Sequence, residues 1–144
     1  MVRQINFDMD GTIANLYGVE NWLDYLLAED TTPYAIAKPM VNMNSLARVL
    51  NRLQRNGYKI CVISWLCKGG SNDYNARVSA VKKEWLAVHL ASVHFDEINI
   101  VPYGTPKNTI GCGVLFDDEE QNRNTWGAGA FGVDNIIEIL KGLE

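Results

Sequence analysis

The chain has 144 residues, of which 47% are hydrophobic and 21% are charged, and its formal net charge is −4. These values are typical of one globular domain with a buried core, so we expect a single domain over residues 1–144. The acidic charge gives no electrostatic basis for strong binding to a nucleic-acid polymer, and no apolar stretch is long enough to suggest a membrane span.

The first predicted elements are a strand at residues 2–7 and a helix with apolar positions at helical spacing. That apolar stripe consists of Val19, Trp22, Leu23, Leu26 and Leu27. Residues 30–39 contain helix breakers, and a second helix follows, with Asn44 or Ser45 as its cap. The stripe of the second helix consists of Leu46, Val49, Leu50 and Leu53, and Asn56-Gly57 ends it.

The second half of the chain continues this alternation. A buried strand is predicted at residues 58–63, followed by a polar loop at 67–74 and a helix that begins around Val78. The inner face of this helix consists of Val78, Val81, Trp85 and Val88. The remaining predicted elements are strands at 98–101, 114–116 and 130–133 and a closing helix at 135–143. The order implies an α/β fold in which helices cover a parallel sheet.

The cysteines bear on the cellular compartment. Cys61, Cys67 and Cys112 are odd in number and show no CxxC spacing, so they indicate neither a zinc site nor a disulfide framework. The N-terminus also lacks the pattern of a secretory signal. We therefore expect a cytoplasmic protein.

Polar side chains follow four of the predicted strands, at the edge where a parallel sheet binds its ligands. They are Asp8, Asp10, Ser64, Lys107, Asp117 and Asp118. Their shared position after strands predicts that they converge on one site.

Asp8 and Asp10 are the most informative of these residues. Strand geometry directs both side chains to the same side, and two carboxylates so close resist joint ionisation unless a cation lies between them or one keeps its proton. A carboxylate nucleophile beside a carboxylic acid, with an oxygen-binding metal, suits the hydrolysis of phosphate esters. An EF-hand is excluded, because its sixth and twelfth positions would be Ile13 and Val19.

The stretch Ile5-Asn6-Phe7-Asp8-Met9-Asp10-Gly11-Thr12 resembles the hhhDxDGT signature of the haloacid dehalogenase superfamily of phosphotransferases. The resemblance spans most of the chain and implies a three-layer, Rossmann-like fold with a mostly parallel sheet. It implies that Asp8 forms an aspartyl-phosphate and that Asp10 acts first as general acid and then as general base. It also assigns the backbone carbonyl of Asp10, rather than its side chain, to the metal.

The metal site implied by this resemblance includes the acidic pair of Leu115-Phe116-Asp117-Asp118, which resembles the fourth motif of the superfamily. Together with Asp8 and Asp10, this pair is expected to bind Mg²⁺. We expect Asp117 to be the direct ligand and Asp118 the second residue, and the reverse order stays open.

The phosphate of the substrate is expected to be held by a hydroxyl group and a lysine. Val62-Ile63-Ser64 resembles the second motif, in which the hydroxyl binds phosphoryl oxygens. For the lysine of the third motif, Lys82 and Lys107 both remain candidates. The order of Ser64, Lys82-x-x-Trp85-Leu86, Lys107 and the Asp117-Asp118 pair further resembles the 5′(3′)-deoxyribonucleotidase branch, although Ile63 and Trp65 depart from its pattern.

Members of the superfamily often insert a cap after the first strand, and residues 15–43 are the corresponding segment. One extra helix fits there, near residues 19–28, so we expect a minimal cap. Tyr17, Trp22, Tyr25 and Trp65 are candidates for stacking on a nucleobase. We expect Trp22 to pack in a core instead, which makes Tyr25 and Trp65 the better candidates.

These features predict a Mg²⁺-dependent phosphomonoester hydrolase that acts on a small phosphorylated substrate, with a nucleotide as the hypothesis drawn from the branch. Two alternatives remain open. The first is a phosphatase for polynucleotide ends, which the small cap favours and the acidic charge disfavours. The second is a binding module that has the fold without the activity. The sequence leaves the oligomeric state open.

Overall fold

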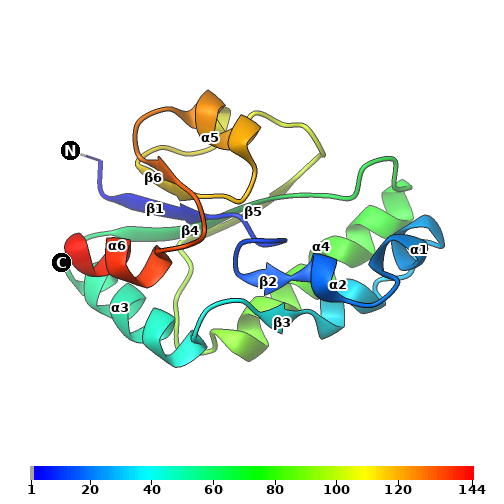
Figure 1. Ribbon diagram of the computed structural model, residues 1–144, viewed down its shortest axis with the longest axis horizontal. Coiled ribbons are helices and arrows are strands. Elements are labelled where there is room, and N and C mark those ends of the chain that lie inside the picture. Colours follow the sequence, from blue (N-terminus) through cyan, green and yellow to red (C-terminus); the bar gives the residue numbers. More distant parts are fainter. Residues whose placement is uncertain (1) are drawn as a thin grey trace.

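The computed structural model describes residues 2–144, which form a five-stranded sheet with helices on both faces (Figure 1). The strand order is β5-β4-β1-β6-β7, and neighbouring strands pair in parallel. The strands are β1 (Gln4–Phe7), β4 (Lys59–Trp65), β5 (Glu97–Val101), β6 (Val114–Phe116) and β7 (Ala130–Phe131). The predicted α/β, Rossmann-like architecture is therefore confirmed.

The helices complete a three-layer arrangement. In Figure 1, α3, α4 and α6 lie below the sheet and α5 lies above it. Their bounds, with those of the short 3₁₀ turns, are α3 (Met43–Arg55), α4 (Asn72–His89), α5 (Glu120–Trp126), α6 (Ile136–Gly142), η1 (Leu16–Gly18) and η2 (Lys107–Thr109). Residues 2–144 contain no helix whose length and hydropathy would let it span a bilayer.

The main core lies between β1, β4 and the helices below the sheet. Strand β4 is buried at five successive positions, as expected for a central strand covered on both faces. The predicted stripe of α3 faces this core, and each of its four residues is 0% exposed. These residues are Leu46, Val49, Leu50 and Leu53. The stripe packs α3 into the same core as Ile5 and Phe7 of β1, the strand that Asp8 follows.

Helix α3 begins earlier than predicted. Its cap is Asn42, whose Oδ1 accepts a hydrogen bond from Ser45 N at 2.9 Å. The predicted caps, Asn44 and Ser45, lie inside the first turn. Asn and Ser favour several positions near a helix start, so the sequence alone did not distinguish them.

Helix α4 also begins earlier, at Asn72 rather than around Val78, with Ser71 as its cap. Lys82 consequently lies in the middle of an 18-residue helix instead of near its start. Val88, predicted on the inner face, is 64% exposed. The buried face of α4 instead includes Lys82 itself.

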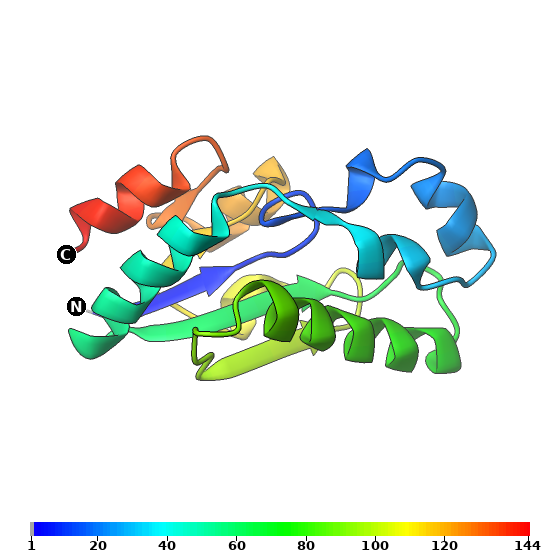
Figure 2. The same ribbon diagram turned by 90° about the horizontal axis from the view of Figure 1, so that it is seen from below.

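The segment of residues 15–43 lies beyond the carboxyl ends of β1 and β4 (Figure 2). Its elements are β2 (Ala14–Asn15), η1, α1 (Trp22–Leu27), α2 (Thr32–Ile36) and β3 (Lys38–Pro39), and β2 pairs with β3. The prediction of one helix here is wrong, because α2 forms within the expected breaker region. Pro33 lies in the first turn of α2, where its missing N–H costs no helical hydrogen bond.

The two short helices of this segment pack differently. No residue of 22–27 in α1 is buried, and Leu27 is 75% exposed. The expectation that Trp22 packs in a core is therefore wrong, since its side chain is half-buried. In α2, Tyr34 is 5% exposed and joins a second apolar cluster with Tyr74 and Val78 of α4. The segment thus has one docked helix and one loosely packed helix.

Candidate active site

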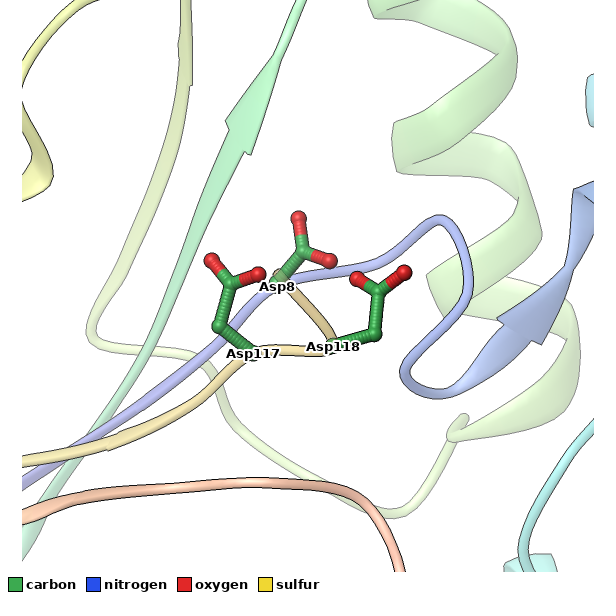
Figure 3. Close-up of side chains that lie close together, drawn as sticks. All are labelled: Asp8, Asp117 and Asp118. Carbon is green, nitrogen blue, oxygen red and sulfur yellow. The ribbon is translucent and has the colours of Figure 1, made fainter. Parts of the chain in front are cut away.

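The carboxyl ends of β1 and β6 bring three aspartates together. These strands pair in parallel, and Asp8 N donates to Phe116 O at 2.9 Å. Asp8 therefore lies beside Asp117 and Asp118, and Figure 3 shows the three side chains pointing the same way. One carboxylate oxygen of each lies within 4.8 Å of the others.

Lys107 lies between two of these carboxylates. Its Nζ is 2.9 Å from Asp8 Oδ1 and 2.7 Å from Asp117 Oδ2, and the residue is 3% exposed. Burial alone would lower the pKa of a lysine, but the charges of Asp8 and Asp117 outweigh burial and raise the pKa of Lys107. An ammonium group has three N–H donors, and these two contacts leave one of them available.

Lys82 uses all of its donors on other groups. Its Nζ donates to Asp10 Oδ2 at 2.9 Å, to Ser64 Oγ at 2.8 Å and to Trp65 O at 2.7 Å. Lys82 is 1% exposed and Ser64 is 0% exposed. Both candidate lysines therefore belong to the site, but only Lys107 keeps a donor that these contacts do not use.

Gly11 and Thr12, in the turn that follows Asp8, both lie against Asp118. Thr12 Oγ1 donates to Asp8 Oδ2 at 2.9 Å and accepts from Asp118 N at 3.2 Å. Gly11 has φ +82°, and a Cβ atom there would lie 2.3 Å from Asp118 Oδ2. A side chain at this position would be strained and would displace Asp118. Glycine is thus required by both the turn and the close approach.

Asp117 and Asp118 differ in how many donors they accept. Asp117 Oδ1 accepts from Glu119 N at 2.9 Å, and its Oδ2 accepts from Lys107 and from Asn122 Nδ2 at 3.1 Å. Among the described residues, the side chain of Asp118 has one such contact, 3.3 Å from Thr12 Oγ1. The single hydroxyl proton of Thr12 has a shorter contact with Asp8. Asp118 is therefore the more open carboxylate.

Asn122 is a site residue that the sequence analysis missed, because α5 was not predicted. Asp117 and Asp118 were predicted directly after a strand, as the structure has them, but the start of a helix at Glu120 was not predicted. Glu120 in the first turn of α5 complements the helix dipole. Asn122 is 8% exposed, and Trp126, four residues later, donates from Nε1 to Gly113 O at 3.0 Å. The sequence therefore offered two signals for α5: an acidic residue at the start of the helix, and the four-residue spacing that places Asn122 and Trp126 on one helical face.

The crowding of carboxylates disfavours their ionisation. Burial, followed by the nearby Asp8 and Asp117, raises the pKa of Asp118 to about 8. Burial and Asp8 also raise the pKa of Asp117, although Lys107 opposes this shift. With all groups ionised, the four aspartates (Asp10 included) and two lysines leave two negative charges unbalanced. The oxygen donors of Asp8, Asp117 and Asp118 therefore fit a hard divalent cation such as Mg²⁺.

A pocket of ≈ 360 Å³ opens over these groups, and Asp8, Asp10, Asp117 and Lys107 line its polar part. The aromatic and leucine side chains of its walls include Leu16, Tyr17, Trp22, Leu23, Leu26, Leu27, Tyr34, Trp65, Leu66 and Tyr103.

The aromatic residues that line the pocket are only partly those that the sequence analysis expected to stack on a nucleobase. Tyr17, Trp22 and Trp65 are wall residues, as is Tyr103, which the sequence analysis did not identify. Tyr25 is not among the residues from 2–144 that line the pocket. Trp65 and Tyr103 meet edge to face, with ring centroids 4.9 Å apart.

The sequence matches no family model and no curated protein. The structure is similar to that of a D,D-heptose 1,7-bisphosphate phosphatase from B. bronchiseptica, complexed with magnesium and phosphate, with a TM-score of 0.60 and 11% identity over 99% of this chain and 98% of the other. It is also similar to a D,D-heptose 1,7-bisphosphate phosphatase from Burkholderia thailandensis, with a TM-score of 0.54 and 11% identity over 98% and 97%. This likeness shows that the chain shares the fold of these two proteins, in agreement with the predicted Rossmann-like α/β architecture.

The raised pKa of Asp118 predicts how the stability of the metal-free protein depends on pH. A carboxyl group whose pKa is higher in the folded state favours folding below its unfolded pKa, and this contribution is lost as the pH rises through the folded value. With a chelator present, we expect the ionisation of Asp118 to lower the melting temperature progressively from about pH 4 to about pH 8. The Asp118→Asn variant should lack this part of the decline. If the melting temperatures of the two proteins change with pH in the same way across this range, the raised pKa of Asp118 is contradicted.

Proposed function

We propose that the protein is a Mg²⁺-dependent phosphomonoesterase that acts through an aspartyl-phosphate on Asp8. The observation that carries this proposal is the placement of Lys107 between Asp8 and Asp117, beside Asp118, at the carboxyl edge of the sheet. The likeness in fold to two phosphatases, one of them complexed with magnesium and phosphate, supports the same reaction class.

The proposed reaction has two displacements at phosphorus. A carboxylate oxygen of Asp8 attacks phosphorus as the ester P–O bond breaks, and the carboxyl group of Asp10 gives its proton to the leaving oxygen. In the second step, Asp10 accepts a proton from water as that water attacks phosphorus. The bond between phosphorus and the Asp8 oxygen then breaks, which releases inorganic phosphate and restores both aspartates.

The two lysines have different proposed roles. The unused N–H donor of Lys107 supports its contact with the substrate phosphate, next to the nucleophile. Because the three donors of Lys82 are used, we assign Lys82 the placement of Asp10 and Ser64. Asp10 Oδ1 has no hydrogen bond to the described residues, which leaves it available for the leaving oxygen.

For the metal, we propose Asp8, Asp118 and the backbone carbonyl of Asp10 as the protein ligands. The openness of Asp118 supports this choice over Asp117, whose two oxygens already accept donors from Lys107, Asn122 and the backbone. When bound, Mg²⁺ would withdraw charge from the phosphoryl oxygens. Asp117 would then hold Lys107 and act on the metal site indirectly.

We propose that residues 15–43 serve as a small cap and that the substrate is a nucleotide. The aromatic walls of the pocket support a flat, partly apolar leaving group, because rings stack well on such surfaces. The pocket volume supports a small molecule over a polynucleotide.

Cys61, Cys67 and Cys112 are free thiols, which supports a reducing, cytoplasmic compartment.

The role of Asp8 can be tested by hydrolysis of 4-nitrophenyl phosphate. We expect Mg²⁺-dependent turnover that Asp8→Asn lowers by about 10³-fold or more, because the variant lacks the nucleophile. Asp134→Asn, a change at an exposed aspartate, should retain full activity. Equal and negligible rates for all three proteins would instead support a binding module without activity.

The proposal that Asp118, rather than Asp117, binds the metal predicts that substitutions of these two residues change the Mg²⁺ requirement of the enzyme differently. We expect Asp118→Asn to raise the Mg²⁺ concentration for half-maximal activity by about tenfold or more, as for loss of a ligand. Asp117→Asn should change this concentration less and should lower the melting temperature, since the buried ammonium group of Lys107 loses the charge of a carboxylate partner. A larger change in Mg²⁺ requirement for Asp117→Asn would reverse the assignment.

Substrate class can be tested with a panel of nucleoside monophosphates and sugar phosphates. We expect kcat/KM to be about tenfold or more higher for nucleotides, because one stacked base contributes about 1–3 kcal/mol. Tyr103→Ala should raise KM for nucleotides, whereas Tyr25→Ala, outside the pocket lining, should not. A preference for sugar phosphates that neither variant alters would reject the nucleotide assignment.

A further inference from the structure

Tyr34 belongs to the proposed cap, yet its ring faces a charged group of the site. The ring centroid lies 5.2 Å from Lys82 Nζ, within the range of a cation–π interaction. Tyr34 is 5% exposed and Lys82 is 1% exposed. Such an attraction is strongest when water is excluded, so this contact helps to fix the ammonium group.

The position of Lys82 in turn determines that of Asp10. Within residues 2–144, Lys82 is the one side chain that donates to the carboxylate of Asp10, at 2.9 Å. The same Nζ also donates to Ser64 Oγ and Trp65 O, so three acceptors and one aromatic ring surround it. A displacement of Nζ would therefore move the Asp10 carboxylate or break one of these bonds.

Tyr34 is itself firmly placed. It packs with Tyr74 and Val78 of α4, the helix that also carries Lys82. Tyr74 Oη donates to Asp30 O at 2.9 Å, which ties the chain just before α2 to the same helix. The ring of Tyr34 is consequently held in a fixed position relative to Lys82, even though α1 in the same segment is loosely packed.

We propose that Tyr34 is a positioning residue, whose ring holds the Lys82 ammonium so that Lys82 aims the Asp10 carboxyl group at the leaving oxygen. This inference rests on the proposed function, in which Asp10 transfers its proton to that oxygen as the ester bond breaks. The cap would then take part in proton transfer, in addition to enclosing the substrate.

The test compares two leaving groups. An alkyl phosphate needs a proton on its leaving oxygen, whereas 4-nitrophenolate leaves readily as an anion, so misplacement of Asp10 should slow formation of the aspartyl-phosphate only with the alkyl phosphate. The two substrates are compared by kcat/KM, which does not include the later attack of water, a step in which Asp10 acts with both substrates. Phenylalanines with zero, one, two and three ring fluorines at position 34 keep the ring size while weakening its attraction for a cation. We expect kcat/KM for the alkyl phosphate to fall stepwise, by about tenfold at three fluorines. The kcat/KM for 4-nitrophenyl phosphate should change less than about twofold, because its leaving group needs no proton from Asp10.

The controls separate this effect from general damage to the cap. Tyr34→Phe, which has no ring fluorine, is the reference for the series, so the loss of the hydroxyl group is common to all the proteins compared. Ile36→Ala, at an exposed position of α2, should leave both rates unchanged. Equal losses for the two substrates, or no loss with three fluorines, would overturn the inference.

A second measurement does not depend on turnover. In protein labelled at lysine Cε, the Tyr34 ring should shift the Lys82 signal away from those of exposed lysines, and Tyr34→Leu should remove this shift. A Lys82 signal that the substitution leaves unchanged would overturn the contact. An inactive wild-type protein that shows the shift would instead reject the proposed function, so the two failures are distinguishable.

Discussion

Repulsion among the carboxylates at one edge of the sheet is the constraint on which the site depends. Parallel pairing of β1 and β6 forces Asp8 beside Asp117 and Asp118, where like charges disfavour joint ionisation. Two buried lysines offset part of this charge, one from the middle of α4 and one from the turn after β5. The remaining negative charge is what the proposed divalent cation would balance, and that cation would in turn attract a phosphate group.

Much of this arrangement could be predicted from the sequence, because its signals are local. The α3 stripe has helical spacing, and a polar residue that follows an apolar strand lies at the ligand-binding edge of a parallel sheet. Other helix starts were ambiguous. Ser71, Asn72 and Asp73 suit a cap as well as a loop, and Pro33 suits a first turn as well as a break. Periodicity also identified the apolar face of α1 without showing that it lines a pocket.

The division of roles between Lys82 and Lys107 required tertiary distances. Both residues follow plausible motif spacing, and both are buried in the structure. What distinguishes them is the number of donors already used, three in Lys82 and two in Lys107. The same holds for the acidic pair: adjacent aspartates are equivalent in the sequence, but the turn at Gly11 approaches Asp118, whereas Asn122 reaches Asp117. The contact of Tyr34 with Lys82 extends this network into the proposed cap.

A fold supports many functions, so the chemistry must be tested at the site itself. The most direct measurement is a crystal structure of the protein with Mg²⁺ and beryllofluoride, which mimics a phosphoryl group attached to a carboxylate. The account predicts beryllium bonded to an oxygen of Asp8, with Lys107 in hydrogen-bonding contact with a fluoride and Mg²⁺ beside Asp118. Beryllofluoride bound elsewhere, with Asp8 still paired to Lys107 and no ion near the three aspartates, would contradict it.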